Sequence, residues 1–482
     1  YGVNSPIKPG PAPAAGDPDL RRQPDRQDFL WETGPDVIDS ADDGDVTTGY
    51  MSNSARSGQT EDLSDTTNAQ RGRWIVAVNN GHYNGEPNGE KAGLVVLDAV
   101  TGGVIRTIPL PSGYSAGDGL SGVTLLRSYG TNTRVVAAYA GDANGQLWKF
   151  NLEGPPSSWH VEHGQPLFTV PGNRPIYGHP AWQAHEAGGF IVVFATGIML
   201  EDDHLDDLDQ QTIYGVWDRQ NLDGTMLNGE AFAPVTEAQL EERTVEQASE
   251  RSRGAFLYYA ILGDEIDWDT QRGWYIRMNN VHETDGALRA GERSIADVQN
   301  FGRSVIITST VLRPPPTGEM CTVADLPANY VYIVNAQEAS PTLSRSYDVD
   351  GDGRMDAWDS NSDSRVDAGY AVAYAQQGGF TRGISVSRFR SRADGTPLPD
   401  DPQQDTGDPS DPQVTESVTD RLEKAADEVA GESFMSPTGP TKCRTMSGTI
   451  LGTGETPLGA GVYCPTTGWS RTQFQLSAPP KN

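Results

Sequence analysis

The stretch RVVAAYAGDANGQLWKFNL, residues 134–152, contains two short apolar runs separated by a polar segment. Val, Tyr, Trp and Phe are enriched in strands, whereas the Gly, Asp and Asn of GDANGQ (141–146) favour a tight turn. The stretch therefore predicts two antiparallel strands joined by that turn. The same organisation recurs where DAVTGG (98–103) follows another apolar run.

Similar short runs occur along most of the chain, each bounded by Gly, Asn, Asp or Pro: RWIVAV, GLVVLDA, FIVVFATG, TIYGVWD, GWYIRM, SVIITSTV and YVYIVNA. Units of a few tens of residues predict an all-β fold, namely a modified β-propeller of about seven blades. We expect loop insertions between its strands, and this chain alone need not close the ring. A β-sandwich is the alternative, and the two turns favour the propeller. Trp148, Trp217 and Trp274 are predicted as blade core rather than as a cofactor platform.

Composition divides the chain into four parts. Residues 1–70 predict a loop-rich N-terminal segment that leads into a propeller over 71–390. Residues 391–416 read as an acidic, Pro/Asp-rich linker. A short helix, TDRLEKAADEVAGES (419–433), and further strands are expected in 417–482. Before residue 415, helical periodicity is confined to about EAQLEERTVEQASER (237–251). The start at YGVNSPIKPG, without Met, predicts a processed chain or a fragment.

The chain is strongly acidic. Lys+Arg total 36 against 66 Asp+Glu, which gives a net charge of −30. Such a surface repels nucleic-acid phosphates and anionic lipids, and it suits cation binding, a saline habitat or both. The longest apolar run, GFIVVFATGIML, is shorter than the roughly 20 residues that a bilayer requires. We therefore expect neither nucleic-acid binding nor a membrane span.

Residues 346–371, SYDVDGDGRMDAWDSNSDSRVDAGYA, place acidic or amide side chains on alternate positions. Ca²⁺ binds about six to eight oxygen atoms, and a D-x-D-x-D-G-x-x-D loop supplies them in order. The spacing predicts a calcium-binding loop at 348–359, in which Gly353 makes the turn. A solvated acidic turn is the alternative. The predicted ligands are Asp348, Asp350, Asp352, the Arg354 carbonyl, Asp356 and, at position twelve, Asp359.

A second register follows directly, with Asn361, Asp363, the Arg365 carbonyl and Asp367 as candidate ligands. It matches the pattern less closely, because Ser364 replaces the glycine and Tyr370 stands at position twelve. The acidic segment EDDHLDDLD (201–209) lacks the alternation and predicts a solvated loop. His160 and His163 lack a third ligand and are predicted as surface residues.

Three cysteines occur: Cys321, Cys443 and Cys464. Cys443 and Cys464 flank a Gly-rich segment, and their positions allow either a disulfide or free thiols. No G-x-S-x-G, H-E-x-x-H or P-loop motif is present, and no catalytic set can be selected among so many carboxylates. The motifs thus nominate no catalytic residue.

Several segments resemble, in order, the C-terminal domain of the PilY1-type family of type IV pilus biogenesis and tip-adhesin proteins. The resemblance runs from about residue 30 to the C-terminus, interrupted by the linker. It is carried by RWIVAVNNGHYNG (73–85), YAGDANGQLWKFNL (139–152), FATGIMLEDDHLDDLDQQTIYGVWD (194–218), the acidic loop and RGISVS (382–387).

The resemblance implies a modified propeller that is secreted through the periplasm of a Gram-negative bacterium and carried at the pilus tip on minor pilins. It also implies adhesion to host or abiotic surfaces and a Ca²⁺ loop that controls pilus extension and retraction. An extracellular location favours the disulfide between Cys443 and Cys464. Two alternatives are a secreted carbohydrate-binding propeller and a quinoprotein-type propeller dehydrogenase, whose blade turns DAVTGG resembles. The adjacent cysteines common in such dehydrogenases are absent.

Overall fold

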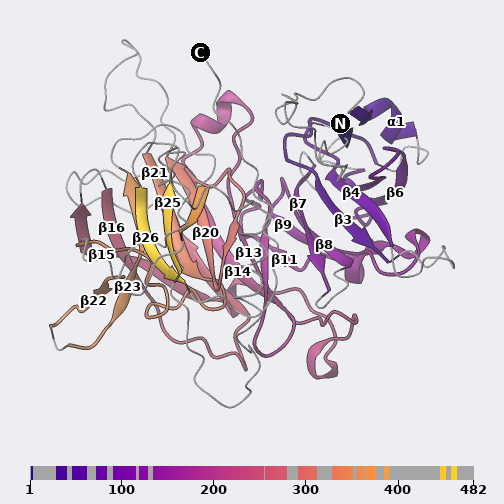
Figure 1. Cartoon of the computed structure of the whole chain (residues 1–482). Coiled ribbons are helices and arrows are strands. Elements are labelled where there is room, and N and C mark those ends of the chain that lie inside the picture. The colour runs from indigo at the N-terminus through magenta and orange to yellow at the C-terminus, as the bar shows by residue number, and fades with distance from the viewer. Residues whose placement is uncertain are drawn as a thin grey trace, which may run out of the picture.

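Most regular structure in the residues that the structure describes is β-strand (Figure 1). The computed structural model describes residues 2–3, 29–40, 46–61, 72–83, 91–114, 119–128, 134–253, 256–278, 291–311, 328–350, 355–362, 364–375, 385–389, 446–451 and 457–463. In these residues the α-helix is α1 (Pro35–Ser40), and none of the described helices has the length and hydropathy of a transmembrane span.

The first large sheet contains two antiparallel meanders that lie together on the right of Figure 1. The first meander is β3 (Arg56–Thr60), β4 (Arg73–Asn79), β5 (Gly93–Asp98) and β6 (Val104–Pro109). The second is β7 (Leu120–Arg127), β8 (Val135–Asp142) and β9 (Gln146–Asn151), with β10 (His160–Val161) and β11 (Phe168–Thr169) on β9. One parallel pairing, Thr60 with Val135, joins them. The sheet thus begins at Arg56, before the boundary that composition indicates.

The second large sheet also combines two groups of strands. One is β12 (Ala181–Ala184), β13 (Phe190–Ala195), β14 (Thr212–Asp218) and β17 (Gly273–Arg277). The other, in sheet order, is β15 (Glu241–Arg253), β16 (Phe256–Leu262), β23 (Ala368–Ala375), β21 (Ala328–Asn335) and β20 (Ser304–Val311). Short strands flank it: β18 (Glu292–Arg293), β19 (Gln299–Phe301) and β22 (Ala357–Trp358).

Four four- to five-stranded groups in the described residues agree with the predicted all-β propeller. The apolar runs that predicted strands all form them. The number of blades, predicted as about seven, stays a prediction. Two smaller sheets complete the described structure: β1 (Gly2–Val3) with β2 (Phe29–Trp31), and β24 (Ser385–Phe389) with β25 (Met446–Leu451) and β26 (Pro457–Tyr463).

The predicted turns are held by their aspartates. At GDANGQ, Asp142 Oδ1 accepts hydrogen bonds from the Asn144 and Gln146 amides at 3.0 and 2.8 Å, and Oδ2 accepts one from the Trp148 indole. At DAVTGG, Asp98 Oδ1 accepts from two following backbone amides. Aspartate favours such turns because its short side chain can satisfy nearby N–H groups.

The tryptophans selected from the sequence lie in the core, as predicted: Trp148 and Trp274 are fully buried and Trp217 is 3% exposed. Trp274 lies directly over β14, where a Cβ at Gly215 would come within 2.3 Å of its indole ring. The glycine is therefore required by the close approach of the ring, since any side chain would displace it.

The helical periodicity at 237–251 does not produce a helix over that range. Only Glu237–Gln239 forms a helical turn, η7, and β15 follows it as an extended strand. Its first residues, Glu241–Arg243, pair in parallel with β17, and the later ones pair with β16. These two neighbours pair with both ends of β15 on either side of an irregularity between Glu246 and Arg251, so tertiary pairing overrides the local pattern. The helix predicted at 419–433 and all three cysteines lie outside the described residues.

Candidate metal centre

The acidic loop (348–359) begins at a firmly fixed position between β21 and β22. Tyr347, which precedes it, is fully buried. Its hydroxyl donates a hydrogen bond to the Val331 carbonyl at 2.9 Å, and its ring packs 5.2 Å from that of Tyr258 on β16. The first predicted ligand, Asp348, is therefore attached to the core.

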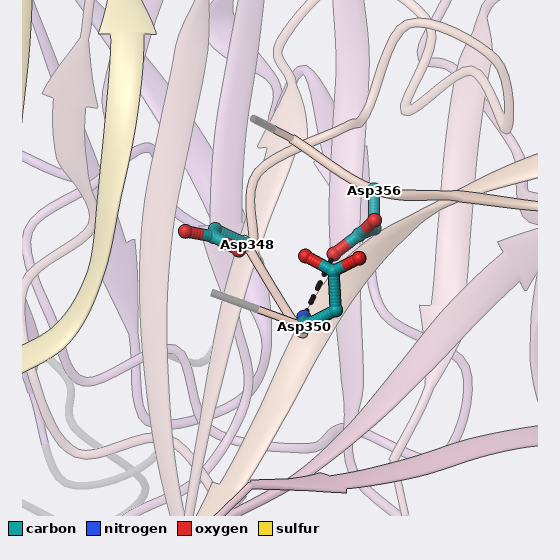
Figure 2. A group of neighbouring side chains, drawn as sticks. All are labelled: Asp348, Asp350 and Asp356. Atoms are coloured by element: carbon teal, nitrogen blue, oxygen red, sulfur yellow. Dashed lines mark hydrogen bonds between the residues drawn. The ribbon is translucent and has the colours of Figure 1, made fainter. Parts of the chain in front are cut away.

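Three carboxylates of the loop converge, those of Asp348, Asp350 and Asp356. Each offers an oxygen atom within 4.8 Å of the other two (Figure 2). Asp348 is 7% exposed, whereas Asp350 is exposed and Asp356 half-buried. Calcium–oxygen distances of about 2.3–2.6 Å place two ligands on opposite sides of one ion at roughly 5 Å from each other. The spacing of the three oxygens thus fits a single calcium ion.

Asp356 also closes the loop. Its Oδ2 accepts hydrogen bonds from the Val349 amide at 2.5 Å and from the Asp350 amide at 3.2 Å, the latter drawn in Figure 2. Its own amide donates to the Tyr347 carbonyl at 2.9 Å. The residue therefore fixes the turn that brings the other two carboxylates together.

Two of the predicted ligands, Asp352 and Arg354, lie outside the described residues, as does Asp363 of the second register. Asp359 is described and lies in the following turn. Its carboxylate accepts hydrogen bonds from the Asn361 amide at 3.2 Å and the Ser364 amide at 2.8 Å. The roles of these residues as ligands stay predictions.

The second register repeats the backbone geometry of the first. The side-chain oxygen Oδ2 of Asp367 accepts a hydrogen bond from the Ser360 amide at 2.8 Å. The backbone amide of Asp367 donates a hydrogen bond to the Trp358 carbonyl. The same bonds join Asp356 to Val349 and Tyr347, eleven residues earlier. Hydrogen bonds from the Ser360 hydroxyl and amide lower the pKa of Asp367. Asn361 and Arg365 lie in this turn, and the three-carboxylate group does not recur there among the described residues.

Sequence reasoning missed one residue of this region. Arg253, at the end of β15, donates through Nη1 to the Asp348 carbonyl at 2.9 Å, and the same nitrogen lies 3.9 Å from Asp348 Oδ1. The two residues are 95 positions apart. No local pattern reveals such a contact, because only the sheet brings β15 to the loop.

The other candidate residues have ordinary surroundings. Five acidic residues around η5 (Asp202–Leu205) are exposed, as the prediction of a solvated loop requires. They are Glu201, Asp202, Asp203, Asp206 and Asp209. His160 is exposed, also as predicted. The prediction for His163 is wrong: it is partly buried and stacks on Phe232 with ring centroids 3.9 Å apart. That aromatic neighbour, distant in sequence, draws the imidazole away from solvent.

Part of this chain, ending before the acidic loop, matches a known family model. Residues 19–252 match the model of the PilY1 beta-propeller domain. The type IV pilus biogenesis factor PilY1 of Pseudomonas aeruginosa strain PAO1 is 26% identical over 324 residues, which cover 59% of this chain and 26% of that protein. The protein of the same name from strain UCBPP-PA14 is 30% identical over 229 residues, 41% of this chain and 18% of its own length. This chain thus spans about a quarter or less of these relatives.

The fold comparison agrees with the sequence comparison. The crystal structure of the Pseudomonas aeruginosa PilY1 C-terminal domain superposes with a TM-score of 0.57 and 23% identity, and the match covers 77% of this chain and 72% of that one. At that identity the match shows a shared fold.

Proposed function

Because the chain belongs to the PilY1-type family, we propose that it is a calcium-binding, non-enzymatic component of type IV pilus biogenesis. The observation that carries the calcium part is the convergence of Asp348, Asp350 and Asp356 within 4.8 Å. The pilus part rests on the relatives, which are type IV pilus biogenesis factors.

The chemistry of the site explains why an ion would be functional there. Three carboxylates that meet at one end of a loop repel one another, and a divalent cation between them removes that repulsion. Oxygen donors alone suit Ca²⁺ better than metals that prefer nitrogen or sulfur ligands. Binding would therefore shift the loop toward one ordered conformation.

The proposed location is the cell surface, reached through the periplasm, at the pilus tip. There the propeller contacts minor pilins and host or abiotic surfaces, and the calcium loop regulates extension against retraction. The family resemblance supports this assignment. The acidic surface, with its net charge of −30, agrees with an extracellular cation-binding protein.

Titration calorimetry with CaCl₂ tests the site. Asp350→Ala removes an exposed carboxylate of the cluster, whereas Asp202→Ala removes an equally exposed carboxylate on η5, outside the cluster. We expect the first variant to lose tight calcium binding and the second to bind like the unchanged protein. Equal affinity in all three would show that the loop is a solvated acidic turn.

Purification of pili tests the cellular role. We expect the protein to be present on sheared pili of the organism that makes it and to be absent when the minor pilins are deleted. Binding to glycans without any association with pili would instead favour the carbohydrate-binding alternative, and a coloured quinone in the purified protein would favour the dehydrogenase.

A further inference from the structure

The hairpin formed by β15 and β16 carries an arginine, Arg253, beside the acidic loop. Arg253 ends β15, and Arg251 precedes it on the same strand. Arg253 Nη1 lies 2.9 Å from the Asp348 carbonyl oxygen and 3.9 Å from the carboxylate oxygen Oδ1. Its side chain is 51% exposed, whereas that of Asp348 is 9% exposed. A positive charge thus stands at the most buried carboxylate of the cluster.

Two tyrosines, Tyr258 and Tyr370, each lie near one of the arginines and one of the aspartates. Burial raises the pKa of Tyr258, and the nearby charges of Arg253 and Asp348 act on it in opposite directions. Burial also raises the pKa of Tyr370, where Arg251 and Asp356 oppose each other in the same way. Arg253 therefore faces the cluster from the hairpin side, and its charge reduces the repulsion among the carboxylates.

The hairpin is also packed against the start of the loop. Tyr258 on β16 contacts Tyr347, the residue before Asp348, and Tyr370 on β23 is partnered with Ala260 of β16. Because Tyr347 is fully buried and hydrogen-bonded, Asp348 cannot move far from the hairpin. The guanidinium is the movable partner of this contact, since it is half exposed at the end of a flexible side chain.

We infer that Arg253 is the internal counter-cation of the acidic loop and that a bound metal ion competes with it for Asp348. This inference rests on the proposed calcium site and concerns its regulation. Without metal, Arg253 partly neutralises the cluster and ties the hairpin to the loop. When Ca²⁺ binds Asp348, the ion and the Arg253 guanidinium repel each other. This repulsion weakens the contact between Arg253 and Asp348, so the end of β15 is no longer held to the loop. Arg253 thereby raises the calcium concentration that is needed to occupy the site.

Calorimetry of Arg253→Gln tests the competition. This variant keeps a hydrogen-bond donor for the Asp348 carbonyl and removes the charge. We expect it to bind Ca²⁺ about threefold more tightly, since the pair is half exposed and partly screened. Arg303→Gln, which removes an exposed arginine paired with Glu186, is the matched control and should leave the affinity unchanged.

Amide hydrogen exchange gives a second readout. We expect Ca²⁺ to accelerate exchange at the end of β15 in the unchanged protein, and to leave it unaltered in Arg253→Gln, where the tie is already weakened. If the unchanged protein binds no calcium, the proposed function fails and the competition with it. If it binds calcium and Arg253→Gln binds equally well or more weakly, the calcium site stands and the competition is wrong.

Discussion

At the scale of single residues, the most consequential carboxylate outside the acidic loop is Asp142. It is fully buried at the turn between β8 and β9, and it accepts three hydrogen bonds, from two backbone amides and the Trp148 indole. One side chain thus joins a turn to the core of its blade. The sequence indicated the turn, and the contact with Trp148 follows from its position six residues later, across the hairpin.

Asp142→Asn is expected to destabilise the fold. The amide nitrogen would replace an oxygen that accepts from a neighbouring N–H, so two donors would face each other in a buried site. A loss of about 1–3 kcal/mol in the free energy of unfolding is expected at pH 8, above the pKa of Asp142 of about 7, where both carboxylate oxygens can accept. Urea denaturation measures it, and Asp209→Asn, at an exposed position, serves as the control. Unchanged stability would mean that water or backbone movement satisfies the site.

The same residue predicts a dependence of stability on pH. Burial raises the pKa of Asp142 to about 7, above its value in the unfolded chain. Between about pH 4 and pH 7 the folded protein keeps a proton that the unfolded chain has lost, so stability falls as pH rises. The slope is at most about 1.4 kcal/mol per pH unit. Chemical denaturation from pH 4 to 8 gives the free energy of unfolding of the unchanged protein and of Asp142→Asn. The difference between the two values should show this slope. A difference that stays constant over this range would contradict the prediction.

At the scale of elements, strands β9 and β14 are tied by a buried ion pair. Lys149 Nζ donates to Asp218 Oδ2 and to Gln220 Oε1, both at 2.6 Å, and the Tyr139 hydroxyl donates to the same aspartate oxygen. Lys149 and Asp218 are 7% and 2% exposed. The contact joins two blades that belong to different sheets, so it fixes their relative position.

Removing one partner of this pair should be costly. Lys149→Met leaves Asp218 buried without its cation, which typically costs about 3–5 kcal/mol. Arg303→Met, which breaks an exposed pair with Glu186, should cost about 1 kcal/mol or less. Chemical denaturation compares the two. Equal losses of unfolding free energy in the two variants would show that Lys149 contributes packing alone. If the double variant Lys149→Met, Asp218→Asn recovers stability, the uncompensated charge of Asp218 is the cause of the loss.

At the scale of the whole molecule, the net charge of −30 makes every added cation stabilising to some degree through screening. A specific site adds a second contribution, because an ion that binds only the folded state stabilises it in proportion to the logarithm of its concentration. The two contributions can be separated by the identity of the ion, since screening by Ca²⁺ and Mg²⁺ is nearly equal.

Thermal unfolding should therefore distinguish them. At 100 times its dissociation constant, Ca²⁺ should raise the free energy of unfolding by about 2.7 kcal/mol and increase Tm by a few degrees. Mg²⁺ at the same concentration should do less, and the difference should disappear in Asp350→Ala. Equal effects of both ions on the unchanged protein would leave screening as the sole cause.

The strands, their turns and the candidate calcium ligands could be predicted from the amino-acid sequence, because alternation, turn chemistry and ligand spacing are local properties. The sequence indicated Asp348, Asp350 and Asp356 as candidates that the fold then brings together. Contacts between distant parts of the chain establish that 241–253 is a strand, that His163 packs on Phe232, and that Arg253 faces Asp348. Each of these features depends on a residue that is distant in the sequence. A local pattern does not indicate which distant strand will pair with a segment or which charged side chain will lie beside it.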